Sequence, residues 1–205
     1  MIIPVDKERI MAEFKTKYVE GRFEDEYPKI QKNLNDNKEA ARKEIFCAFS
    51  ELCSKAKKQQ EESLKNEIKY IYISYLRTSI QQNSGIYRID LYDDKWYLDK
   101  EECSVNIDLS FVYESLFNYI KELQDRKKEY GRTITEMDVE KIRLKEADKY
   151  HKIGVRFLES IVNDLVEGNE YKEMKKSGEI SILAGEYRDE AVLIYETSKK
   201  IKDKN

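Results

Sequence analysis

The pattern that most constrains this chain is a long amphipathic stretch between Thr135 and Gly168. Thr135 and Asp138 have the spacing of a capping box, and Gly168 suits a helix end. Gly154 interrupts the stretch, which predicts that a neighbouring element packs closely there. The apolar positions recur at the spacing of one helix face: Val139, Ile142, Ala147, Tyr150, Phe157, Leu158, Ile161 and Leu165. A helix of this length must bury its apolar face, so the rest of the chain must supply a second layer.

Residues 1–65 are predicted to be helical. Asp6 is an expected N-cap, and the first helix should end before Gly21. A shorter helix is expected from Pro28, and a longer one from Asp36, whose side chain can cap it. Two arrangements stay open for residues 1–65: they pack on the rest of the domain, or they form a semi-independent helical arm.

Residues 67–80, EIKYIYISYLRTSI, are predicted to form a strand that is buried on both faces. Isoleucine and tyrosine occupy both odd and even positions, as expected where each face of a strand packs against apolar side chains. The spacing of Ile68, Ile71 and Tyr75 also fits a helix, so the strand is favoured rather than required. Residues 81–85 should then turn the chain.

Residues 86–99, IYRIDLYDDKWYLD, are predicted to form a β-hairpin. A two-residue turn that starts at Asp93 pairs apolar residues, Leu98 among them, on the core face. It places Arg88 opposite Asp99 and Asp90 opposite Tyr97 on the other face. A four-residue turn instead places Asp90 opposite Asp99, a like-charge pair that needs a bound cation between its carboxylates. The two-residue turn is favoured because it needs no cation. The aspartates are therefore interpreted as a turn and a solvated outer face.

The remaining sequence adds a helix and a second hairpin. Ser110 is expected to begin a helix that ends near Gly131, ahead of the long helix. Apolar runs on both sides of Arg188 predict a C-terminal hairpin, and residues 196–205 are expected to be a frayed tail. The order of elements predicts one α+β domain over residues 1–205, with a helical N-terminal part, an antiparallel β-meander or hairpin in the middle, two further long helices and a C-terminal β-hairpin. We expect its sheet to be antiparallel.

The composition indicates a globular protein without a strong charge signal. Hydrophobic residues make up 40% of the chain, too many and too periodic for a disordered one. The 38 basic and 41 acidic side chains are intermixed and leave a net charge of -3, so charge points to neither a nucleic acid nor a membrane surface. Three cysteines without an export signal predict reduced thiols and a cytoplasmic location. Abundant lysine, isoleucine, tyrosine and asparagine are typical of an AT-rich, bacterial genome.

Sequence motifs of common enzymes are absent. The chain has no phosphate-binding glycine loop, no GxSxG and no HExxH motif. His151 is the only histidine, and Cys47, Cys53 and Cys103 lack the short spacing of zinc ligands, so we expect packing roles for all four. No cofactor is predicted, and a non-enzymatic function is favoured over catalysis.

Tyrosine is the distinctive excess, with 15 residues, and several lie in the predicted strands between residues 67 and 99. Tyrosines are ordinary sheet residues, but together with arginine they also form the anchors of protein interfaces. The candidate binding residues, expected on an exposed sheet face, are Tyr72, Arg88, Tyr92, Trp96 and Tyr97.

Three functional hypotheses follow. The favoured one is a protein-binding or regulatory module that uses the tyrosine-rich sheet face for a protein partner or for self-association. The second is a metal-dependent phosphodiesterase or nuclease in which Asp90 and Asp99 hold a divalent cation. The third is binding of single-stranded nucleic acid by the aromatic face with Arg77, Arg88 and Lys95. No membrane partner is predicted.

Overall fold

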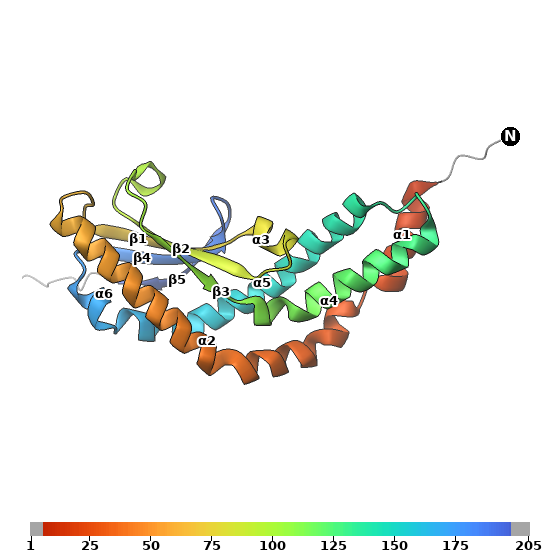
Figure 1. Cartoon of the computed structure of the whole chain (residues 1–205), viewed down its shortest axis with the longest axis horizontal. Helices are drawn as coiled ribbons and strands as arrows, with labels where there is room; N and C mark the ends of the chain where they lie inside the picture. The colour runs from red at the N-terminus through yellow and green to blue at the C-terminus, as the bar shows by residue number, and fades with distance from the viewer. Residues whose placement is uncertain (1–5, 198–205) are drawn as a thin grey trace, which may run out of the picture. The chain divides into compact units, whose positions relative to one another are not determined.

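The computed structural model describes residues 6–197 as helices and a five-stranded sheet (Figure 1), which confirms the predicted α+β class. The backbone divides into two compact units, each built from separate stretches of sequence. The helical unit contains residues 6–38, 77–85 and 110–153, and the sheet unit contains residues 39–76, 86–109 and 154–197. The single-domain organisation stays a prediction, and residues 198–205 of the predicted frayed tail lie outside the described residues.

The helical unit consists of helices whose ends are marked in the sequence. Asp6 caps the first helix, because its Oδ1 accepts the N–H of Arg9 at 3.0 Å. The long helix begins with the predicted capping box: the N–H of Thr135 donates to Asp138 Oδ2 at 2.9 Å, and the N–H of Asp138 donates to Thr135 Oγ1 at 3.2 Å. The helical segments of this unit are α1 (Lys7–Tyr18), the N-terminal part of α2 (Arg22–Glu61), α3 (Arg77–Gln81), α4 (Ser110–Arg126), the 3-10 helix η2 (Lys127–Tyr130) and the N-terminal part of α5 (Glu136–Val166).

Helix α2 is continuous, so the prediction of two separate helices from Pro28 and Asp36 is wrong. Asn37 bonds within the helix instead of ending it, since its Nδ2 donates to the carbonyl oxygen of Asn33 at 2.8 Å. The boundary with α1 is as expected, because Gly21 has a φ of 77°. The prediction that this region is helical is therefore confirmed, but its predicted division into three helices is not.

Buried aromatic and polar side chains hold the helical unit together. Tyr113 of α4 and Tyr150 of α5 are both buried, and their rings stack with centroids 6.0 Å apart. Arg143 of α5 is also buried, and its Nη1 donates to the carbonyl oxygens of Gln81 at 2.6 Å and Ile80 at 3.3 Å. Arg143 thus binds two carbonyl groups at the C-terminal end of α3, where helix carbonyls lack regular helical partners.

The sheet has the strand order β3-β2-β1-β4-β5. Its first three strands form an antiparallel meander and its last two form the C-terminal hairpin, so both predicted motifs are confirmed. The expectation of an antiparallel sheet throughout is wrong, because β1 and β4 run parallel. Parallel pairing is possible here because two helices, α4 and α5, lie between these strands in the chain. The strands are β1 (Ile68–Tyr75), β2 (Ile86–Tyr92), β3 (Ser104–Asp108), β4 (Lys176–Glu186) and β5 (Ala191–Glu196).

The predicted strand over residues 67–80 is correct in its first part only. Strand β1 is largely buried on both faces, as expected for the central strand of a sheet. The strand ends at Tyr75, and the residues that follow form α3. The contacts of Arg143 with α3 join residues far apart in the chain, and the local pattern of residue types does not contain them.

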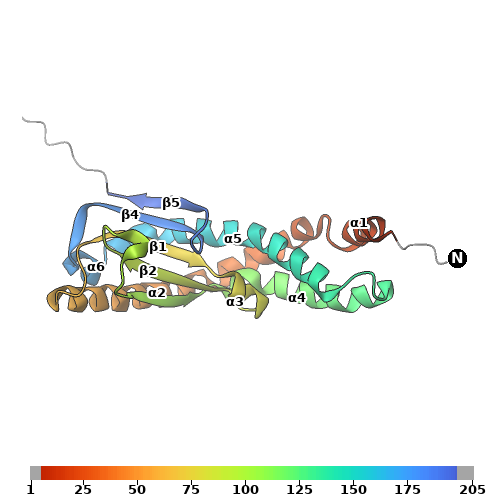
Figure 2. The same ribbon diagram turned by 90° about the horizontal axis from the view of Figure 1, so that it is seen from above.

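One face of the sheet carries the apolar core of the sheet unit. The parts of α2 and α5 that belong to this unit cover that face, together with the short helix α6 (Asn169–Glu173) (Figures 1 and 2). A Cβ added at Gly154 of α5 would lie 2.8 Å from Tyr87 Oη, which confirms the close packing expected at that glycine. Fully or almost fully buried core side chains of the sheet include Ile71, Ile73, Tyr75, Tyr87, Ile89, Leu91 and Ile182.

The predicted hairpin over residues 86–99 is wrong beyond its first strand. Strand β2 pairs with β3, and Asp90 lies opposite Ser104 rather than opposite Asp99 or Tyr97. The intervening residues 93–103, here called the β2–β3 loop, rise from the sheet face opposite the helices and contain the 3-10 helix η1 (Trp96–Leu98) (Figures 1 and 2). Trp96 has a φ of 57°, a left-handed conformation that is incompatible with a strand.

Candidate functional site

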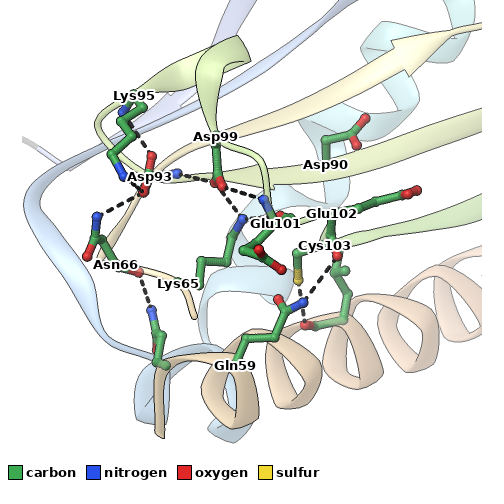
Figure 3. A network of polar contacts seen from close by, with 12 residues as sticks. Gln59, Lys65, Asn66, Asp90, Asp93, Lys95, Asp99, Glu101, Glu102 and Cys103 are labelled. Atoms are coloured by element: carbon green, nitrogen blue, oxygen red, sulfur yellow. Dashed lines mark hydrogen bonds and ion pairs between the residues drawn. The ribbon is translucent and has the colours of Figure 1, made fainter. Parts of the chain in front are cut away.

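A network of buried polar contacts holds the β2–β3 loop (Figure 3). Lys65 Nζ lies 2.5 Å from Asp99 Oδ2 and 2.8 Å from the carbonyl oxygen of Glu101. The Lys65 side chain is fully buried, and that of Asp99 is 4% exposed. A buried cation and carboxylate depend on each other, because either one alone would be left as an unpaired charge in a low dielectric. The pair therefore ties the loop to the segment that follows α2.

The two loop aspartates also accept backbone N–H groups. The carboxylate of Asp99 accepts the amides of Asp93 and Glu101, each at 3.1 Å. Asp93 accepts the amide of Lys95 at 2.9 Å and the side-chain amide of Asn66 at 3.0 Å. Asp93 thus forms an Asx turn, in which an aspartate bonds the amide two residues on, but the predicted two-residue hairpin turn at Asp93 and Asp94 does not form.

The solvated outer face predicted for the aspartates is wrong for Asp90, Asp93 and Asp99, whereas Asp94 is exposed. Asp90 and Asp93 are 3% and 2% exposed. Arg88 accounts for the burial of Asp90: its Nε lies 2.9 Å from both carboxylate oxygens and its Nη2 lies 2.7 Å from Oδ1. The spacing of two in a strand places Arg88 and Asp90 on the same side, but this signal was missed because the predicted hairpin paired Arg88 with Asp99.

Asp90 and Asp99 have different cationic partners, Arg88 and Lys65 (Figure 3 shows the two carboxylates apart). Among residues 6–197, no group of three or more histidine, cysteine, aspartate or glutamate side chains is placed to hold a metal ion. The hydrolase hypothesis rested on a strand register that does not occur. It stays a prediction without support from the arrangement of these side chains.

The aromatic candidates come together on the sheet face that carries the β2–β3 loop. The ring of Trp96 meets that of Tyr70 edge-on with centroids 4.0 Å apart. Trp96 also lies 6.1 Å from Tyr72 and 5.2 Å from Tyr97, while Tyr92 lies 5.5 Å from Tyr97. Edge-on ring contacts at these distances stabilise the fold by more than the burial of apolar area alone would give. These aromatic rings form one cluster, and their role as a binding site stays a prediction.

Tyr72, which we expected on an exposed surface, is 2% exposed. Its hydroxyl donates to the carbonyl oxygen of Glu186 at 2.7 Å, and it lies 3.3 Å from that of Asp189. Burial, followed by the neighbouring Tyr97, raises the pKa of Tyr72 above its ordinary value. Tyr72 therefore joins the centre of the sheet to the turn between β4 and β5, and a partner cannot reach it in this conformation.

The turn between β4 and β5 meets the β2–β3 loop through Arg188. Its guanidinium carbon lies 5.4 Å from the ring centroid of Tyr97 and 5.3 Å from that of Tyr187, both within cation–π range. Arg188 has a φ of 58°, so two non-glycine residues with left-handed backbones, Trp96 and Arg188, lie in the segments that meet here. The loop and the turn together cover Tyr72.

The side chain that stands out from this cluster is Leu98, which is 79% exposed. Tyr187 is 37% exposed, while Tyr92, Trp96 and Tyr97 are half-buried. Sequence reasoning missed Leu98 and also Lys65, and for different reasons. Alternation in the expected hairpin placed Leu98 in the core, and no local signal distinguishes Lys65 from the other lysines.

Arg88 and Lys95, two cations of the nucleic-acid hypothesis, are paired with acids, whereas Arg188 stacks on tyrosine rings. Arg88 lies 3.1 Å from Glu102 in addition to its contacts with Asp90, and Lys95 Nζ lies 3.9 Å from Asp93. Arg77, the third cation of the nucleic-acid hypothesis, belongs to α3 of the helical unit. The pairing of Arg88 and Lys95 reduces the positive charge that these two side chains offer to a phosphate backbone. Nucleic-acid binding stays a prediction.

The packing role expected of the cysteines holds for Cys53 and Cys103, but it is wrong for Cys47, which is exposed. Burial lowers the pKa of His151 to about 4, so its ring is neutral near pH 7. Cys53 and Cys103 are buried and Cys47 is exposed, and all three are unpaired. Burial raises the pKa of the Cys53 thiol to about 12 and that of Cys103 to about 11, which opposes a role as nucleophile.

Comparisons with protein families, with curated proteins and with solved structures find no match for this chain. In the part of the chain that the structure describes, none of the helices has the length and apolar character that a membrane span requires. The site must therefore be interpreted from its own chemistry.

Proposed function

We propose that this chain is a protein-binding module whose binding surface is formed by the β2–β3 loop and the turn between β4 and β5. The surface consists of Trp96, Tyr97, Leu98, Tyr187 and Arg188, and it is called the loop surface below. The observation that carries the proposal is that Leu98 is 79% exposed on a loop whose backbone amides bind buried carboxylates.

The composition of the loop surface suits a protein partner. Tryptophan, tyrosine and arginine are the residues most enriched among the side chains that dominate binding free energy. A loop that is already held in one conformation loses little entropy on binding, so its apolar contacts contribute more to the affinity. Leu98 would enter a pocket of the partner, with Trp96 and Tyr97 packing around it.

The pairing of charged side chains in the aromatic cluster favours binding over catalysis. The cations and acids of the cluster are paired with each other, and Arg188 stacks on tyrosine rings. We also infer a cytoplasmic location, supported by three unpaired cysteines of which two are buried. A second copy of the chain would use the same aromatic chemistry as a different protein, and the experiment below separates the two.

Photo-crosslinking from single positions tests this proposal. A photoreactive amino acid is placed at position 98 in the full chain, in cells of its source organism, and the same substitution at Met137 serves as the control. Met137 is 68% exposed on α5 of the helical unit, so both side chains are large, apolar and accessible. We expect a discrete crosslinked protein from position 98, absent from position 137 and reduced by Tyr97→Ala.

The masses of the products decide between the alternatives. A product with twice the mass of the chain would assign the loop surface to self-association, and another discrete mass would identify a different protein partner. The same products from both positions, or none from position 98, would contradict the proposal.

A further inference from the structure

We propose that Lys65 and Asp99 form a latch that holds the β2–β3 loop closed over Tyr72, and that loss of either partner opens the loop while the sheet unit stays folded. The latch acts in the chain alone, so it stands apart from the proposed protein binding. Its parts are the buried ion pair and the two amides that Asp99 accepts (Figure 3), together with the aromatic rings of the loop that cover Tyr72.

Asp99 occupies a position from which it fixes both ends of η1. Its Oδ2 accepts the amide of Asp93, which precedes η1, and its Oδ1 accepts the amide of Glu101, which follows it. Lys65 bonds the same Oδ2 at 2.5 Å and also the carbonyl oxygen of Glu101 at 2.8 Å. One ion pair thus secures the loop on both sides of Trp96 and joins it to the segment after α2.

The closed loop also contains backbone strain that favours opening. Trp96 has a φ of 57°, and a bulky side chain adopts this conformation only where its surroundings impose it. Arg188, which stacks on Tyr97 from the facing turn, has a φ of 58°. Once the latch is removed, opening relieves the strain at Trp96.

The charge left behind after a substitution favours opening as well. Without Lys65, the Asp99 carboxylate would be buried with no cation beside it. Without the Asp99 charge, the Lys65 ammonium would be buried with no anion beside it. The loop can place the remaining charge in water by swinging away from the sheet, whereas the strands need not separate. Loss of one buried partner should shift the ratio of closed to open loop by about a hundredfold or more, which is about 3 kcal/mol at 1.4 kcal/mol per tenfold.

The chain contains its own probe of the latch, because Trp96 is the only tryptophan. The variants are Lys65→Met and Asp99→Asn, and the control is Lys57→Met in the same unit. Lys57 also forms an ion pair, with Glu173 at 2.8 Å, but the two side chains are 43% and 61% exposed, so little should depend on it.

We expect a red-shifted emission of Trp96 and stronger quenching by acrylamide in both latch variants, with the far-UV circular dichroism of the parent retained. The control should match the parent in all three measurements. The proposal is overturned if Trp96 stays shielded in either variant. It is also overturned if either variant loses its far-UV signal, because the ion pair would then support the whole unit rather than the loop.

Discussion

Replacement of Gly185 by alanine should destabilise the sheet unit, whereas the same replacement at Gly178 in the same strand should not. Gly185 lies opposite Ala191 in the β4–β5 hairpin. A Cβ added there would lie 2.2 Å from the carbonyl oxygen of Glu190 and 2.4 Å from Ala191 Cα, and such backbone atoms cannot move aside without the strand. Nothing lies within 4 Å of a Cβ added at Gly178.

The magnitude follows from the movement that the new methyl group requires. To restore an ordinary contact of about 3.5 Å, strand β5 and its turn must shift by about 1 Å. This shift strains two hydrogen bonds, from the N–H of Glu186 to the carbonyl oxygen of Glu190 at 2.9 Å and from Tyr72 to the carbonyl oxygen of Glu186 at 2.7 Å. Overpacking costs about 1–3 kcal/mol and a weakened hydrogen bond about 1 kcal/mol, so we expect a loss of about 3 kcal/mol.

Urea and thermal unfolding measure this loss, with far-UV circular dichroism for the whole chain and the fluorescence of Trp96 for the sheet unit. A loss of about 3 kcal/mol lowers the Tm of a chain of this size by roughly 6–12 °C. Gly178→Ala should instead stabilise slightly, by at most about 1 kcal/mol, because glycine loses more backbone entropy on folding. Equal unfolding midpoints for the parent and Gly185→Ala would refute the hairpin register and the close approach at Gly185.

Three other measurements check separate parts of the structure. Iodoacetamide at neutral pH should modify Cys47 well before the other thiols, as followed by intact mass, because burial raises the pKa of Cys53 to about 12 and that of Cys103 to about 11. The free energy of unfolding should fall as the pH drops from 6.5 to about 4, because burial lowers the pKa of His151 to about 4 and only the unfolded chain takes up its proton in this range. The loss is up to about 3 kcal/mol in urea unfolding, and His151→Gln should flatten this part of the profile. Arg143→Met should cost about 3 kcal/mol in the same assay, since it removes charged hydrogen bonds to two carbonyl groups of α3, and an unchanged midpoint would contradict that role.

Features that depend on residues close together in the sequence could be predicted. The caps at Asp6 and Thr135 are examples, because each involves residues three positions apart. The β4–β5 hairpin is another, since its turn lies between two apolar runs. The prediction of a helix break at Asp36 was wrong because an asparagine side chain can also bond a helix carbonyl. Only the structure shows which bond forms.

The candidate site was predicted by residue type but not by arrangement. The alternation of apolar residues predicted a hairpin, yet Asp99 is drawn inward by Lys65, which lies 34 positions earlier in the chain. The left-handed backbone of Trp96 follows from this contact and from ring packing rather than from its own preference. Leu98 was consequently placed in the core although it is 79% exposed. A tyrosine cluster on the paired strands could be predicted, because side chains at every second position of a strand lie on the same face of the sheet.

Hydrogen exchange at the backbone amides of Asp93 and Glu101 tests most directly the central claim that buried carboxylate contacts fix the β2–β3 loop. Both amides donate to Asp99 at 3.1 Å, outside the regular ladder of the sheet. A hydrogen bond to a charged acceptor is worth about 1.5–3 kcal/mol, so both amides should exchange at least about tenfold more slowly than in an unstructured peptide. Exchange at the unstructured rate would show that the loop is not held, and it would contradict both the pre-arranged loop surface and the latch.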